Sequence, residues 1–178
     1  MVAYAAYYFP VVLGGFLTWL ESTAFSVWIR ESPSVFAFPA ILSCHTIGMG
    51  LVAGINGAIA LRILGVAPQV PLEEMKRFLP IMWFGFWLNA VSGVVLLIGY
   101  PTKAVTNPVF YLKLGLILIA VILVKRIAGR IFRGPAPGTV ATSGSVKRLA
   151  VGSLVCWAGA ITAGRLLAYT YTRLMMTF

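Results

Sequence analysis

Four long apolar stretches dominate this sequence and limit what the chain can fold into. Each reaches, or can be extended to, the roughly 20 residues that an α-helix needs to cross the hydrocarbon core of a bilayer. Lipid cannot satisfy the unpaired N–H and C=O groups of irregular backbone, so these stretches are expected to be helices. They are residues 32–61, 78–102, 107–124 with Lys113 inside it, and 149–164.

The composition agrees with a membrane protein and disagrees with a water-soluble one. Hydrophobic residues make up 60% of the 178 residues and charged residues 10%, and the mean hydropathy is +0.95. So few polar side chains cannot cover a surface in water. The net charge of +10 does not indicate nucleic-acid binding, because no basic stripe is interleaved with aromatic residues. The expected partner of this surface is the lipid bilayer.

The positions of the basic residues predict the orientation of the helices. Basic residues flank two of the connections: Arg62, Lys76 and Arg77 the first, and Lys125, Arg126, Arg130, Arg133, Lys147 and Arg148 the third. Cytoplasmic loops carry an excess of Lys and Arg. The loop 65–72 and the linker 134–146 are therefore predicted to be cytoplasmic, and the loop 101–107 external. We expect a multi-pass protein of a bacterial inner (cytoplasmic) membrane.

The predicted fold class is all-α, an integral membrane four-helix bundle within a domain of residues 34–178. Pro33 marks the start of the first helix, and Gly65 supplies its stop. Glu73 and Glu74 lie in the opening turn of the second helix, where the helix dipole favours acidic side chains. The predicted spans are residues 34–64, 74–100, 108–131 and 147–171.

Residues 1–33 form a separate, aromatic-rich segment. A polar residue recurs every four positions, which predicts a polar stripe on an otherwise aromatic helix: Thr18, Ser22, Ser26 and Arg30. That pattern is typical of a helix in the membrane interface. The segment is therefore predicted to be interfacial or re-entrant. Residues 2–17 are also apolar enough for a fifth span, although Pro10 disfavours a straight helix.

Polar side chains inside the predicted spans are the candidate functional residues, because lipid makes each of them costly. They are His45, Asn56, Asn89, Ser92, Lys113, Thr162 and Arg165. His45 and Arg165 each lie 17 residues from a basic boundary residue, Arg62 or Arg148, and thus at the same depth, roughly 25 Å away. Lys113, near the start of the third span, belongs to a similar level.

One imidazole with two cations at equal depth is a candidate site for an anionic cofactor, and haem b fits this pattern. His45 would supply the axial nitrogen to iron, while Arg165 and Lys113 would neutralise the propionates. The chain has a single histidine. The sixth iron position would therefore be vacant, filled by Met82 or Met49, or supplied by a partner chain. On this hypothesis the protein transfers electrons near the outer face of the membrane.

Three other hypotheses explain the same residues. His45 could hydrogen-bond a neighbouring helix while Arg165 reaches outward or pairs with a glutamate of the N-terminal segment, which gives both a structural role. Cys44, His45 and Met49 have ligand types that suit Cu(I), although Cys44 points about 100° away from His45 on a helix. The outer cations could also form the vestibule of a transporter for a small solute.

Several classes of chemistry have no candidate residues. The chain has no Asp, and its four Glu lie outside the apolar stretches, which excludes paired-carboxylate catalysis and a Ser-His-Asp triad. Cys44 and Cys156 both lie in apolar stretches, and no CxxC or CxxCH occurs. Covalent c-type haem and a zinc ribbon are therefore excluded. The sequence predicts no particular enzyme activity.

Amide and small residues on the predicted helices indicate packing contacts. Asn56 and Asn89 are predicted to face the bundle interior and to satisfy each other or a water. Small residues at four-residue spacing permit close helix approach: Gly50, Gly54 and Ala58, and Ala160 and Gly164. A small bundle without a catalytic set of its own is typically a subunit. We therefore expect these faces to contact a second copy or other membrane subunits, in a structural or assembly role.

Four segments carry a resemblance to a known group of proteins. They are HTIGMGLVAGINGAIALRILG, MWFGFWLNAVSG, NPVFYLKLGLILI and WAGAITAGR. In this order and spacing the chain resembles, over residues 16–172, a group of small bacterial four-helix membrane proteins of unknown function. The resemblance implies that His45 and the Gly164, Arg165 pair are family features, and it implies no activity. A looser likeness to cytochrome b561 and copper-resistance membrane subunits supports haem by analogy.

Overall fold

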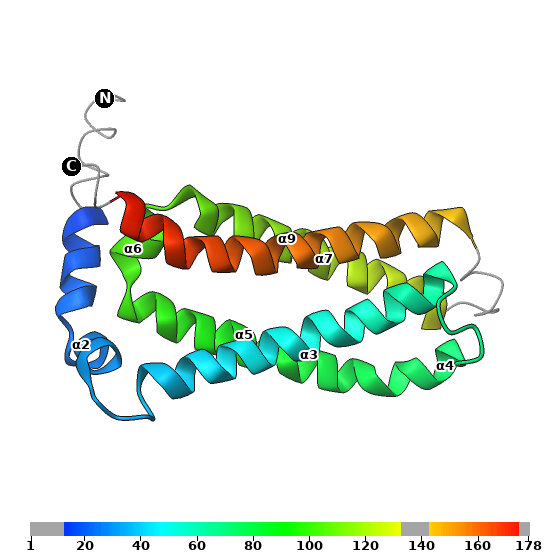
Figure 1. Ribbon diagram of the computed structural model, residues 1–178, viewed down its shortest axis with the longest axis horizontal. Coiled ribbons are helices and arrows are strands. Elements are labelled where there is room, and N and C mark those ends of the chain that lie inside the picture. The colour runs from blue at the N-terminus through cyan, green and yellow to red at the C-terminus, as the bar shows by residue number, and fades with distance from the viewer. Residues whose placement is uncertain (1–12, 133–142, 175–178) are drawn as a thin grey trace, which may run out of the picture.

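The computed structural model describes residues 13–132 and 143–174, and every regular element in this part of the chain is helical (Figure 1). Residues 13–22 form a first helical segment. The elements that follow are α2 (Ala24–Glu31), α3 (Phe38–Leu64), α4 (Leu72–Met75), η1 (Lys76–Phe78), α5 (Leu79–Gly99), α6 (Pro101–Val105), α7 (Pro108–Phe132) and α9 (Gly144–Leu174). The predicted all-α fold class is confirmed.

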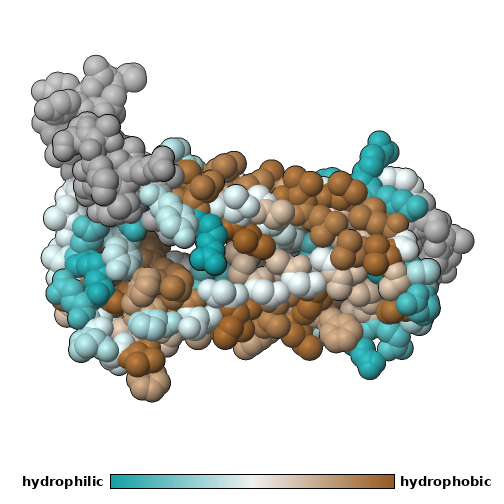
Figure 2. All heavy atoms as spheres, in the orientation of Figure 1, coloured by the Kyte–Doolittle hydropathy of each residue, from teal (hydrophilic) through white to brown (hydrophobic). Residues whose placement is uncertain are grey.

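Within the described residues, four helices are long and apolar enough to cross a membrane: Phe38–Leu64, Leu72–Gly99, Pro108–Phe132 and Gly144–Leu167. They confirm the four predicted spans. Hydrophobic residues cover much of the flank of the bundle, and hydrophilic residues gather at its two ends (Figure 2). A bundle whose sides contact lipid and whose ends contact water needs this distribution. The chain is thus built as a multi-pass membrane protein.

The first spanning helix begins later than predicted. Local hydrogen bonds compete with the helix before it: Ser34 N donates to Ser32 Oγ at 3.2 Å and Phe36 N to Ser34 Oγ at 3.2 Å. Helix α3 therefore begins at Phe38 rather than at residue 34. Its end agrees with the prediction, because Gly65 adopts the left-handed conformation, with φ of 103°, that closes a helix.

The bundle consists of two helical hairpins. Helix α3 packs along α5, α7 packs along α9, and the two pairs are joined mainly through α3 and α9, whereas α5 and α7 make little contact with each other. In the α7–α9 pair, glycines of α9 receive leucines of α7: a Cβ on Gly159 would lie 3.1 Å from Leu116, and one on Gly152 3.3 Å from Leu123. Such close approach is typical of membrane helices.

The N-terminal segment lies across one end of the bundle (Figure 1). Thr23 interrupts it and caps α2 by accepting a hydrogen bond from Ser26 N at 3.3 Å, so the predicted polar stripe does not lie on one continuous helix. Arg30 Nη1 donates to Ser26 Oγ at 2.7 Å and to the Gly99 carbonyl oxygen at 2.9 Å. A guanidinium at the C-terminus of α5 satisfies a carbonyl there and complements the helix dipole.

The two ends of the bundle differ in composition. We call the end covered by residues 13–37 the capped end, and the opposite end, with Arg62, Lys76, Lys125 and Arg148, the basic end. At the capped end, α6 occupies part of the predicted loop 101–107. The interfacial role of residues 1–33 stays a prediction. Most of the fifth-span alternative and of the linker 134–146 falls on residues 1–12 and 133–142, outside the described part.

Candidate functional site

His45 lies on α3 where the backbones of α3 and α5 approach closely. A Cβ atom on Gly48 would lie 2.6 Å from Asn89 N and 2.7 Å from the Gly85 carbonyl oxygen, so any larger residue would push the helices apart. Because the backbones are this near, Asn89 Nδ2 reaches across and donates to the His45 carbonyl oxygen at 2.7 Å. The glycines thus determine which residue of α5 meets the histidine.

Two hydrogen bonds orient the imidazole ring. His45 Nδ1 lies 3.0 Å from the Asn89 carbonyl oxygen and 3.3 Å from Ser92 Oγ. A carbonyl oxygen only accepts, so the network assigns the proton to Nδ1, which donates to Asn89. Nε2 then keeps its lone pair. In histidines that bind a metal or accept a hydrogen bond through one ring nitrogen, the other ring nitrogen often donates to a backbone carbonyl in this way.

The lone pair of Nε2 faces Lys113 of α7, whose Nζ lies 3.4 Å away. Two glycines border this pair. A Cβ on Gly93 of α5 would lie 3.1 Å from His45 Cε1, and a Cβ on Gly164 of α9 would lie 3.6 Å from Lys113 Nζ. All four spanning helices therefore meet around one imidazole and one ammonium group.

This pair lines a cavity of about 320 Å³ near the capped end. Its polar lining is His45, Lys113, Lys103 and Tyr100, and Lys103 Nζ lies 5.6 Å from the centre of the Tyr100 ring. The rest of the lining is apolar or glycine: Phe38, Leu42, Gly93, Leu96, Leu97, Ala104, Phe110, Gly164 and Leu167. The cavity thus combines an apolar wall with a small number of cationic and hydrogen-bonding groups.

The cavity contains no carboxylate side chain. All four Glu fall within the described part of the chain, and none of them lines the cavity. Glu21 accepts from Thr102 N at 3.2 Å, and Glu74 pairs with Arg77 at 2.9 Å at the basic end. Lys113 is only partly exposed, and its hydrogen-bond partner in the described chain is Nε2 of the His45 imidazole. Its charge is therefore not balanced by a glutamate.

The other predicted site residues do not join this pair. Arg165 follows Gly164 at the predicted depth, but its side chain is exposed and does not line the cavity. Met82, 2% exposed, lies in the central core with Val52 and Trp157 and also does not line the cavity. The structure thus brings His45 together with Lys113 and leaves Arg165 and Met82 apart from them.

The residues of the copper hypothesis are also spread apart. Cys44 is exposed on the surface of α3, whereas Met49 is partly buried and packs against the central core. Among the described residues, no group of three His, Cys, Asp or Glu side chains could hold a metal ion.

The predicted pairing of Asn56 with Asn89 is wrong. Asn56, which is buried, donates from Nδ2 to Ser153 Oγ at 3.3 Å and so joins α3 to α9. Asn89 instead serves His45. The two amides bind different neighbours, because α3 contacts α5 on one side and α9 on the other.

The sequence predicts a packing contact for Asn89, but not its joint role with Ser92 and Gly93 around His45. Asn89, Ser92 and Gly93 follow the i, i+3, i+4 spacing of one helix face. That spacing places two hydrogen-bonding groups and one small residue on the same side of α5. This spacing indicates a position on α5 where one side chain from another helix can pack and form hydrogen bonds.

Comparison with known protein-family models, curated proteins and solved structures gives no match. The resemblance to small bacterial four-helix membrane proteins therefore stays a prediction.

Proposed function

We propose that the protein binds a small amphipathic anion in the cavity at the capped end, with Lys113 and His45 holding its charged group. One observation carries this proposal: a partly buried ammonium group faces an apolar cavity that has no carboxylate. Buried charges in proteins are normally paired, because leaving one unpaired is costly. An anionic ligand would supply the missing partner.

The chemistry of the cavity selects a carboxylate with an apolar body. The Lys113 ammonium can donate to a carboxylate, and a hydrogen bond to a charged group contributes about 1.5–3 kcal/mol. The leucine and phenylalanine side chains of the wall, among them Phe38 and Phe110, suit an apolar body. A volume of about 320 Å³ falls at the small end of known ligand sites.

Haem b also joins carboxylates to an apolar body, although that body is larger than the small anion that a cavity of about 320 Å³ suits. His45 and Lys113 are the residues that would hold it, with Nε2 as the iron ligand, and bound haem would supply one-electron transfer. The network that fixes Nδ1 as the donor supports this use of Nε2. The contact of Lys113 with Nε2 would have to open to admit iron. A copper ion bound at His45 would also require the contact of Lys113 with Nε2 to open.

The purified protein in mild detergent tests the proposal. We expect octanoate or phenylacetate to raise the midpoint of thermal unfolding by about 5 °C at saturation. Octanol and phenylethanol, which lack the charge, should raise it by less than a third of that amount. Equal shifts from the charged and neutral compounds would contradict the proposal. An absorption spectrum of the same sample separates the haem case, since a Soret band lost in His45→Ala identifies haem b.

A second candidate function is that of a subunit, and the outer face of α3 favours it. Gly50, Gly54 and Ala58 are exposed, and a Cβ on Gly50 or Gly54 would have no atom of the described chain within 4 Å. The predicted counterpart on α9 is used inside the chain, because Ala160 is buried and Gly164 lies against Lys113. The α3 face is thus the one open to a second copy, or to other membrane subunits in an assembly role.

Gly54→Leu tests this second function. We expect the wild-type protein to be oligomeric in mild detergent, and the variant to dissociate, because leucine prevents close approach of two α3 helices. Native mass spectrometry measures the assembly. Gly115→Leu is the matched control, since Gly115 is an exposed glycine on α7 with the same open surroundings. A monomeric wild type, or a Gly54→Leu variant of unchanged mass, would rule this function out.

The basic residues support a bacterial inner membrane protein with its basic end in the cytoplasm. Ser143 and Thr106 are exposed at opposite ends of the bundle, and a cysteine at each reports the orientation. In intact cells we expect an impermeant maleimide to label Thr106→Cys and not Ser143→Cys. Labelling of Ser143→Cys from outside would reverse the topology.

A further inference from the structure

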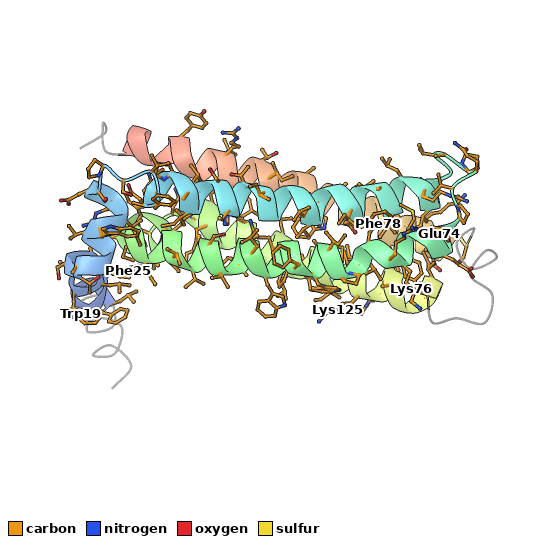
Figure 3. All side chains as sticks on the ribbon, turned by 90° about the horizontal axis from the view of Figure 1, so that it is seen from below. Trp19, Phe25, Glu74, Lys76, Phe78 and Lys125 are labelled. Atoms are coloured by element: carbon orange, nitrogen blue, oxygen red, sulfur yellow. The ribbon has the colours of Figure 1, made fainter. Side chains whose placement is uncertain are left out.

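A groove runs between α5 and α7 at the basic end of the bundle. These two helices make little contact with each other, and the groove between them has a volume of about 600 Å³. Lys76 and Lys125 line it from opposite helical elements, and both lie toward this end in the side view, far from Trp19 and Phe25 at the capped end (Figure 3). It is separate from the cavity that holds His45.

The charged groups of this groove are all cationic. Lys76 and Lys125 belong to its lining and no glutamate does. Glu74, two residues before Lys76, forms an ion pair with Arg77 at 2.9 Å. Lys125 Nζ lies 5.6 Å from the centre of the Trp83 ring, which holds the ammonium beside the groove. The groove therefore favours an anionic group at its mouth.

The remaining lining is apolar. Leu79, Trp83 and Val124 form the wall toward the middle of the bundle, and Phe132 lies nearer its end. Gly129 leaves open space, since a Cβ there would meet no atom within 4 Å. Because α5 and α7 are long and apolar enough to span a membrane, we expect this wall to face lipid chains and the lysines to lie near the head groups.

We propose that this groove binds an anionic phospholipid, with its phosphate between Lys76 and Lys125 and its acyl chains along the seam of α5 and α7. Charge complementarity selects the occupant, because basic pockets between spanning helices attract anionic head groups. The bound lipid would fill the space that the weak α5–α7 contact leaves. This site does not depend on the ligand proposed for the other cavity.

Native mass spectrometry of the purified full chain tests the lipid site. We expect phosphatidylglycerol to bind about tenfold more tightly than phosphatidylcholine with the same acyl chains. In the double variant Lys76→Gln/Lys125→Gln the preference should fall to about twofold or less. Lys76→Arg/Lys125→Arg should keep it, since the charge remains. Both lysines are exposed, so we expect each variant to fold, and circular dichroism checks this.

Lys147→Gln/Arg148→Gln is the matched control. Both residues are exposed at the basic end, on α9, and neither lines the groove. This variant removes the same charge and should keep the full preference for phosphatidylglycerol. The proposal is overturned by equal binding of the two lipids to the wild type, by an equal loss of preference in both glutamine variants, or by a second copy of the chain occupying the seam.

Discussion

Replacing Gly48 with alanine is expected to destabilise the protein strongly. The new Cβ would lie 2.6 Å from Asn89 N and 2.7 Å from the Gly85 carbonyl oxygen. Both are backbone atoms of α5, so neither can move without the whole helix. Overpacking of a tight core typically costs about 1–3 kcal/mol, and separating the helices also weakens the hydrogen bonds between Asn89 and His45. Thermal unfolding in detergent, followed by circular dichroism, should show a midpoint lower by about 5 °C or more.

Gly115→Ala is the control for this variant. Gly115 is exposed on α7, away from the α3 face proposed for a second copy, and a Cβ there would meet no atom of the described chain within 4 Å. Alanine has the higher helix propensity, so the midpoint should stay the same or rise slightly. If Gly48→Ala and Gly115→Ala had the same midpoint, the close contact of α3 and α5 that positions His45 would be wrong.

The spanning helices could be predicted because lipid leaves the backbone few alternatives. Long apolar stretches, basic flanks and the Gly65 stop located all four, and three of the four first residues and three of the four last residues fall within three residues of the observed spans. The start of α3 was missed by more, because Ser32 and Ser34 bond locally to the backbone. Such competition depends on side-chain geometry that hydropathy does not report.

The direction of each side chain was harder to predict than its depth. In water, the apolar face of a helix shows which side points inward, but helices surrounded by lipid are apolar on all sides. Counting residues placed Lys113 and Arg165 at the depth of His45, yet only Lys113 reaches it. Successive residues point about 100° apart around a helix. Gly164 therefore lines the cavity, whereas Arg165 points away from it.

Contacts between helices were the part that the sequence left open. Asn56 bonds Ser153 and Asn89 bonds His45, because α3 lies between α5 and α9. The order of packing in a bundle depends on loops and on small residues such as Gly48 and Gly85. Periodicity within one helix cannot report it. The break at Thr23 and the bond of Arg30 to Gly99 likewise depend on tertiary contact.

Lys113→Met is expected to weaken ligand binding strongly while preserving the fold. Methionine is similar in length, apolar and flexible, so it can lie in the same cavity beside Gly164. Loss of a hydrogen bond from a charged group should weaken the binding of a carboxylate by about 10- to 100-fold. Stability without ligand should stay the same or rise, because the substitution removes an unpaired charge from an apolar cavity. Lys113→Arg keeps the charge and should retain part of the binding.

Thermal unfolding of wild type and Lys113→Met, each with and without octanoate, distinguishes an anion site from a contact that only joins helices. We expect octanoate to stabilise the wild type and not the variant, and we expect the variant without octanoate to unfold at a temperature similar to that of the wild type or higher. The opposite result would be a variant that unfolds at a clearly lower temperature and still responds to octanoate. Lys113 would then serve to join helices through His45, and the cavity would not be an anion site.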